Sequence, residues 1–215
     1  MASAPQGDSR EHEDLLRRAA EGDRESWGAL LALHRERLRR MVSLRIDHRV
    51  RARLDPSDVI QDAFLEASNR LREYLDQPTL PFFLWLRLLT GQKLVTLHRH
   101  HLGVHMRDAG REVSLERGGA LAASSAAMAI ELLGHEPRPS EAAVQAELQQ
   151  ALQTALEQMD PLDREILALR HFEQLSNAEA ARVLDIQESA ASKRYIRAVR
   201  RLKEVLTSIP GGSTL

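Results

Sequence analysis

The feature that most constrains the fold is the segment from Leu175 to Lys203, which reads as two short helices separated by a tight corner. Ser176 is followed three residues later by Glu179, and this capping box marks the start of the first helix. Residues 185–187 interrupt the helical pattern before Glu188 opens a longer helix. This layout is typical of a helix-turn-helix.

The second of these helices carries nearly all of the local positive charge. At about 100° per residue, Lys193, Arg197 and Arg200 fall on one stripe. The opposite stripe can pack against the rest of the protein and contains Ala191, Tyr195, Ala198, Leu202 and Leu206. Glu188 is the only acidic residue before Lys203, whereas a solvated surface helix usually intersperses both signs. Because an α-helix with Lys or Arg on one face fits the major groove, the pattern favours DNA binding over a merely solvated basic surface.

The rest of the chain is also expected to be helical, so the predicted fold class is all-α. No segment shows sustained apolar and polar alternation, and aromatic residues make up only 4% of the chain. Asp55-Pro56 and Asp160-Pro161 each place a capping residue before a proline at the first helical position. We expect helices over residues 11–21, 24–47, 57–75, 81–101, 140–158, 161–171, 176–184 and 188–207.

The helical pattern breaks between Gly103 and Pro139, where glycines and prolines surround the low-complexity run ALAASSAAMAI. We interpret residues 103–139 as a flexible linker with at most one short helix. Two small helical domains then result, over residues 10–102 and 140–209. A connection of this length favours two separately anchored modules.

Composition excludes several classes of protein. The chain lacks cysteine, which rules out disulfides and thiolate metal sites. His98, His101 and His105 have helical spacing but few nearby carboxylates, so neither a metal site nor any cofactor is expected. No apolar run approaches the ~20 residues that cross a bilayer, and the N-terminal segment lacks the pattern of a signal peptide. We expect a cytoplasmic protein without membrane insertion. The absence of a phosphate-binding loop and of hydrolase motifs argues against an enzyme.

The order of the motifs resembles that of bacterial sigma factors of the extracytoplasmic-function (ECF) type. An acidic D-x-x-Q-D-x-F helix begins at Asp58, and an F-x-x-W-L segment begins at Phe82. A basic helix, a variable linker and the helix-turn-helix follow. The resemblance extends from about Leu15 to Leu206, and it implies that the two domains correspond to sigma domains 2 and 4.

The resemblance also implies roles for individual residues. The family grips the clamp of the largest subunit of core RNA polymerase with a helix that matches Asp58, Gln61, Asp62 and Phe64. It melts and reads the minus-10 element of promoter DNA with a segment that includes Gln92, Thr96, His98 and Arg99. The loop Arg72 to Thr79 would receive a flipped base. It reads the minus-35 element as duplex DNA with residues that match Ser192, Lys193, Arg194 and Arg197.

Two other readings stay open at this point. The chain could be a helix-turn-helix regulator that binds an operator, with an N-terminal lobe that senses a ligand or dimerises, or it could be a helical adaptor that binds only proteins. The combination of the Asp58 to Phe64 motif with the Phe82 to Leu86 segment favours the sigma factor, because an operator-binding repressor needs no melting surface. An anti-sigma protein is a further partner that the resemblance suggests.

Overall fold

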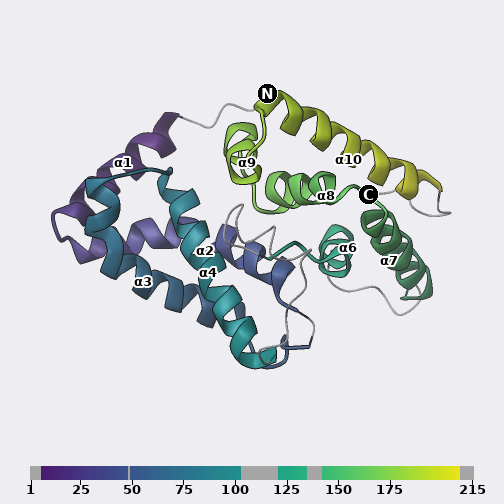
Figure 1. Ribbon diagram of the computed structural model, residues 1–215, viewed down its shortest axis with the longest axis horizontal. Coiled ribbons are helices and arrows are strands. Elements are labelled where there is room, and N and C mark those ends of the chain that lie inside the picture. The colour runs from purple at the N-terminus through teal and green to yellow at the C-terminus, as the bar shows by residue number, and fades with distance from the viewer. Residues whose placement is uncertain (1–5, 48, 103–120, 135–141, 209–215) are drawn as a thin grey trace.

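The computed structural model describes residues 6–47, 49–102, 121–134 and 142–208. Within these ranges every regular element is a helix, which confirms the all-α fold class (Figure 1). The elements are α1 (Gln6–Ala20), α2 (Arg24–Arg45), α3 (Pro56–Asp76), α4 (Phe82–Leu102), α6 (Ser125–Leu133), α7 (Ala142–Glu157), α8 (Pro161–Leu167), a π-helical turn η1 (Ala168–Phe172), α9 (Asn177–Leu184) and α10 (Glu188–Ser208).

The two Asp-Pro pairs begin helices as the sequence predicts. The Asp55 carboxylate accepts a hydrogen bond from the backbone N–H of Ser57 at 2.7 Å, at the start of α3. The Asp160 carboxylate accepts one from Leu162 at 2.9 Å, at the start of α8. Each bond satisfies an N–H that the first helical turn leaves without a partner. The helix expected over residues 161–171 differs in one respect, since it changes from α to π geometry at Ala168.

The N-terminal lobe consists of α1 to α4. The first turns of α4 are buried on all sides, and Phe82, Phe83 and Trp85 are core residues of this lobe. The Trp85 ring stacks on Tyr74 of α3 with the ring centroids 4.5 Å apart. A helix that is apolar around its whole circumference has to be enclosed, and α2 and α3 enclose α4 here. These aromatic rings therefore stabilise the lobe rather than forming an exposed platform for bases.

The C-terminal lobe is built on α7, α8, α9 and α10, and α6 packs against it. Met128 of α6 is buried among apolar side chains of α7 and α8, including Leu152 and Leu167. The helix α6 lies in the linker, for which at most one short helix was expected. Linker residues 103–120 and 135–139 lie outside the described residues.

The two lobes share a core instead of standing apart. One apolar cluster joins Leu38 and Leu86 of the N-terminal lobe to Leu169 and Leu184 of the C-terminal lobe. The linker segment takes part, because the N–H of Ser124 donates to the carbonyl oxygen of Leu44 at 2.8 Å. Figure 1 shows the purple and blue helices of the first lobe beside the green helices of the second. The structure is thus a closed arrangement of the lobes.

A buried cluster of charges also crosses this junction. Glu173, which follows η1, is fully buried and lies between two arginines of the N-terminal lobe. Its carboxylate lies 2.5 Å from a guanidinium nitrogen of Arg45 on α2 and 2.7 Å from Nε of Arg87 on α4. Burial acts to raise the pKa of the Glu173 carboxyl, but the charges of Arg45 and Arg87 outweigh burial and hold this pKa below its ordinary value. Arg45 also pairs with Glu165 of α8.

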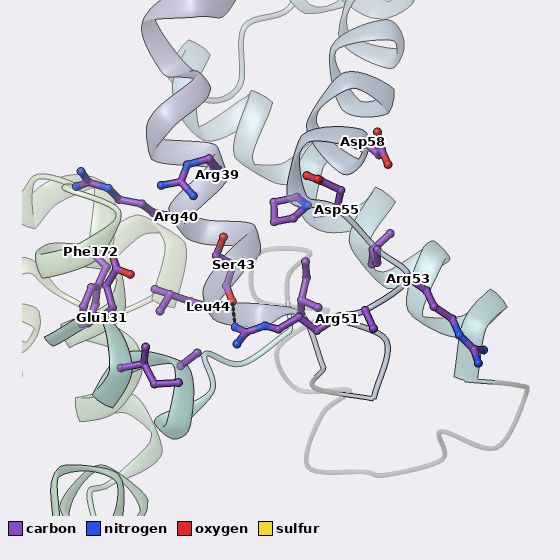
Figure 2. Close-up of a pocket in the computed structure, with 16 residues that line it drawn as sticks. Arg39, Arg40, Ser43, Leu44, Arg51, Arg53, Asp55, Asp58, Glu131 and Phe172 are labelled. Carbon is purple, nitrogen blue, oxygen red and sulfur yellow. Dashed lines mark hydrogen bonds between the residues drawn. The ribbon is translucent and has the colours of Figure 1, made fainter. Parts of the chain in front are cut away.

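A cleft of about 760 Å³ opens beside this junction, between α2, the segment before α3, and α6 (Figure 2). Arg39 and Arg40 of α2 project along one side of it, and Asp55 and Asp58 stand at the start of α3 on the other. Arg51 donates a hydrogen bond to the carbonyl oxygen of Ser43 at 3.1 Å and so ties the intervening segment to α2.

Candidate nucleic-acid and protein-binding surfaces

The helix-turn-helix forms as the sequence predicts. Ser176 and Glu179 make both bonds of the capping box: the Ser176 hydroxyl accepts from the N–H of Glu179 at 3.2 Å, and the Glu179 carboxylate accepts from the N–H of Ser176 at 2.7 Å. The corner turns at Asp185, which has a φ of 53°. The Asn177 amide donates to the carbonyl oxygen of Glu188 at 2.8 Å and fixes the start of α10 against α9.

The exposed face of α10 carries the basic stripe. Lys193, Arg197 and Arg200 are exposed, while Ala191, Ala198 and Leu202 of the opposite stripe are buried. Ser192 is half-buried at the edge between the two faces. The amphipathic pattern read from the sequence is therefore confirmed, and α10 presents cations to solvent along its length.

Two of the predicted minus-35 residues are also engaged within the protein. Arg194 lies 2.6 Å from Asp163 of α8, and Arg197 donates through its terminal nitrogen to Asp163 at 2.7 Å and again through Nε. Burial acts to raise the pKa of the Asp163 carboxyl, but hydrogen bonds from Arg197 and Arg194 outweigh it and lower this pKa. Arg197 keeps 62% of its side chain exposed, whereas Arg194 keeps 25%. Both arginines therefore join α10 to α8, and Lys193 is a further exposed candidate for DNA contact.

The residues predicted for minus-10 DNA separate into two groups on α4. Gln92, Thr96 and Arg99 are exposed and follow one another at helical spacing, so they share a face. His98 is only 2% exposed, and its Nε2 accepts a hydrogen bond from the N–H of Asp47 at 3.3 Å. The helix turns His98 toward α2, so this residue does not belong to the exposed surface.

A pocket of about 610 Å³ adjoins that face, between the end of α3 and α4. Its lining includes Tyr74, Thr79, Trp85 and Gln92. The Tyr74 hydroxyl donates to the carbonyl oxygen of Leu80 at 3.0 Å, which holds the connecting loop at the pocket's edge. The loop is shorter than the range Arg72 to Thr79 suggested, because α3 continues to Asp76. The pocket adjoins the segment to which the resemblance assigned a flipped base, and that role stays a prediction.

The predicted polymerase-binding residues of α3 are not equivalent. Asp58 and Gln61 are exposed, and Asp62 lies 3.2 Å from Lys93 of α4. Phe64 instead packs against the N-terminal core. The exposed face contains a residue that the sequence reading missed, Leu65, of which 60% is exposed. At about 100° per residue Leu65 falls between Asp58 and Gln61 around the helix axis. This angular position was the only signal in the sequence that Leu65 belongs to the exposed face.

Among the described residues, no group of three or more histidine, aspartate or glutamate side chains lies close enough to hold a metal ion. His105, the third histidine of the spacing noted in the sequence, falls outside those residues. No helix in the described ranges has the length and apolar character that crossing a membrane requires.

Comparison with known proteins defines the class. Residues 140–202 match the family model of sigma-70 region 4. The ECF RNA polymerase sigma factor BldN of Streptomyces coelicolor is 26% identical over 203 residues, which are 94% of this chain and 69% of the relative. The RNA polymerase sigma factor NccH of Alcaligenes xylosoxydans xylosoxydans is 29% identical over 91% of this chain and 95% of its own length. These matches relate the chain to the sigma factors of bacterial RNA polymerase.

The arrangement of helices is also similar to that of a solved sigma factor. The structure of CnrH in complex with the cytosolic domain of CnrY covers 93% of this chain and 99% of that chain, with a TM-score of 0.54 and 24% sequence identity. The RNA polymerase sigma factor CnrH of Cupriavidus metallidurans itself aligns with 89% of this chain at 29% identity. In sequence and in helix arrangement the chain is therefore similar to ECF sigma factors over nearly its whole length, as the motif order indicated.

Proposed function

We propose that the chain binds core RNA polymerase through the exposed face of α3 and brings it to promoters through α4 and α10. Residues 10–102 then act as sigma domain 2, and residues 140–209 act as sigma domain 4. The protein directs transcription initiation, and the chemistry of RNA synthesis belongs to the polymerase. Since core polymerase and chromosomal DNA are its partners, we expect it to act in the cytoplasm.

The observation that carries this proposal is the exposed face of α10 on a correctly capped helix-turn-helix. Lys193 lies near the start of that helix, where major-groove binders contact bases and phosphates. On α4, the exposed row of Gln92, Thr96 and Arg99 supports a role in binding single-stranded minus-10 DNA, and the adjoining pocket offers space for an unstacked base.

The closed arrangement of the lobes has to open on a promoter. A compact chain of this length has a radius of gyration of ~17 Å, and hence a diameter of roughly 45 Å. The minus-10 and minus-35 elements are centred about 25 base pairs apart, which is roughly 85 Å along straight duplex DNA at 3.4 Å per base pair. The closed molecule is too short to contact both elements, so we propose that the lobes separate when the polymerase positions them.

A regulatory protein can exploit this equilibrium. The relative CnrH was solved in complex with the cytosolic domain of CnrY. For this chain we propose an anti-sigma partner that binds the closed arrangement, and the cleft of Figure 2 is its best-placed docking point because both lobes line it. Any ligand that prefers the closed form will oppose promoter binding by its difference in affinity for the two forms.

The test is transcription reconstituted from this protein and purified bacterial core polymerase on a promoter library. Lys193→Ala should weaken initiation at the selected promoter by about 1–3 kcal/mol while core binding is retained. Asp58→Arg should do the reverse, because it reverses a charge on the exposed face of α3; the same reversal at exposed Glu21, directly after α1, is the matched control. If the chain forms no complex with core polymerase, the proposal fails. Sequence-specific DNA binding without polymerase would favour an operator-binding regulator instead.

A further inference from the structure

Ile196 is an exposed apolar residue within the cationic face of α10. Its side chain is 54% exposed, although isoleucine is among the residue types most often buried. It follows Lys193 by one turn and precedes Arg200 by one turn. At about 100° per residue it falls within 60° of both, so the three side chains share one face. Packing within the protein does not account for an isoleucine at this position.

The neighbours of Ile196 indicate what covers it. On one side the cations Lys193 and Arg200 are suited to phosphates or to base edges. On the other side are the half-buried hydroxyl of Ser192 and the 40% exposed Val199. A protein partner with an apolar patch would have to bury those cations, whereas a DNA major groove accepts cations and one apolar side chain together. Charge complementarity therefore favours duplex DNA.

Only one base offers an apolar partner in that groove. Thymine carries a C5-methyl group, and the other major-groove positions present hydrogen-bond donors or acceptors. Isoleucine is branched at Cβ and has few χ1 rotamers in a helix, so it can meet a methyl group with little loss of conformational freedom. We propose that Ile196 is a specificity-determining residue of this sigma factor and selects a thymine in the upstream promoter element through its methyl group. This inference rests on the proposed function.

The experiment uses the full-length protein with core polymerase and the promoter selected from the library. Each thymine of the upstream element, on either strand, is replaced in turn by deoxyuridine, which lacks only the methyl group and keeps the base pair. Wild-type holoenzyme should bind about fourfold more weakly at one or two of these positions, since a fourfold loss corresponds to ~0.8 kcal/mol for one buried methyl or methylene group.

Two variants assign that effect to the side chain. Ile196→Ala should bind the thymine promoter more weakly and should no longer distinguish thymine from deoxyuridine, whereas Ile196→Val should retain most of the discrimination. Val144→Ala removes an equally exposed apolar side chain from α7 and should change neither affinity nor discrimination. Circular dichroism should show the same helix content for all three variants.

Three results would overturn the inference: an upstream element selected without any A·T pair, a wild-type holoenzyme indifferent to deoxyuridine at every position, or full discrimination in Ile196→Ala. A fourth result concerns the proposed function instead. If the wild-type chain selects no promoter with core polymerase, the proposed function fails and the inference fails with it, and this outcome is recognisable before any deoxyuridine is introduced.

Discussion

Replacing Glu173 by alanine should destabilise the closed structure by about 3 kcal/mol. Removing one partner of a buried ion pair costs ~3–5 kcal/mol, because the remaining charge stays buried without compensation. Glu173 contacts two arginines, but Arg45 keeps a second carboxylate in Glu165, so Arg87 alone is left without a counter-charge among the ion pairs described. The lower end of the range therefore applies. Domains are stabilised by only ~5–15 kcal/mol, so this loss is large.

A double variant tests the reason for the loss. If the cost comes from an uncompensated charge, removing that charge should restore stability, because a buried pair replaced by apolar residues of similar volume is often neutral. Glu173→Met combined with Arg87→Met should therefore be more stable than Glu173→Met alone. Glu204→Ala is the matched control, since it removes a carboxylate from an exposed pair with Arg201 and should cost less than about 1 kcal/mol.

Urea denaturation at pH 7 measures the free energy of unfolding, and fluorescence energy transfer measures whether the lobes separate. The chain contains no cysteine, so cysteines introduced at exposed Glu21, directly after α1, and at exposed Lys203 of α10 can be labelled selectively. Glu173→Ala should lower transfer at urea concentrations that leave the helices folded. The proposed role of the Glu173 cluster in holding the lobes together would be refuted by either of two results. One is a Glu173→Ala variant as stable as wild type with unchanged energy transfer, and the other is a double variant less stable than Glu173→Met.

Two further predictions concern the N-terminal lobe. Burial, together with His12 and Arg37, lowers the pKa of His34 to about 4, so in the folded protein this histidine stays neutral while in the unfolded chain it binds a proton below about 6.5. The free energy of unfolding should therefore fall as pH decreases from about 6.5 to about 4. At 1.36 kcal/mol per pKa unit, His34 should contribute up to roughly 3 kcal/mol to this fall. Urea titrations at pH 7 and pH 5 should show a smaller loss of stability for His34→Gln than for the wild type. Leu65→Ala should weaken binding to core polymerase by about tenfold, as for an apolar residue at the centre of an interface, with the melting temperature unchanged. Leu33→Ala, which truncates a similarly exposed leucine on α2, should leave core binding unaltered, and an equal loss in both variants would argue against the α3 face.

Local signals in the sequence were sufficient for the starts of α3, α8 and α9. Asp55, Asp160 and Ser176 each lie within three residues of the backbone groups that they cap, so the information needed to place a helix start is contained in a few consecutive residues. The buried stripe of α10 follows equally from helical spacing. The residue order that resembles ECF sigma factors extended these local predictions to the whole chain.

The junction of the lobes could not be read in the same way. Glu173 and Arg87 are separated by 86 residues, and in sequence each resembles an ordinary surface charge. The same holds for Asp163, which accepts a hydrogen bond from Arg197 although the two residues are 34 positions apart in the sequence. Arg197, a predicted DNA contact, therefore also links two helices of the protein. His98 shows the complementary difficulty. It belongs to a segment with the right motif, but only the packing of the neighbouring helices determines that this side chain turns inward.

The chemistry of the lobe junction suits an interface that closes specifically and opens again. Apolar side chains alone would favour closure strongly and would expose an adhesive surface after opening. A buried charge cluster behaves differently, because the desolvation cost of the charges offsets much of their attraction. When the lobes separate, Glu173 and both arginines are hydrated again. Opening therefore costs less free energy than it would if the same buried area were apolar. Closure nevertheless requires Glu173 to reach both arginines, which restricts the closed form to one arrangement of the lobes. On this view the polar cluster makes the closed state specific and reversible, as the proposed separation of the lobes on promoter DNA requires.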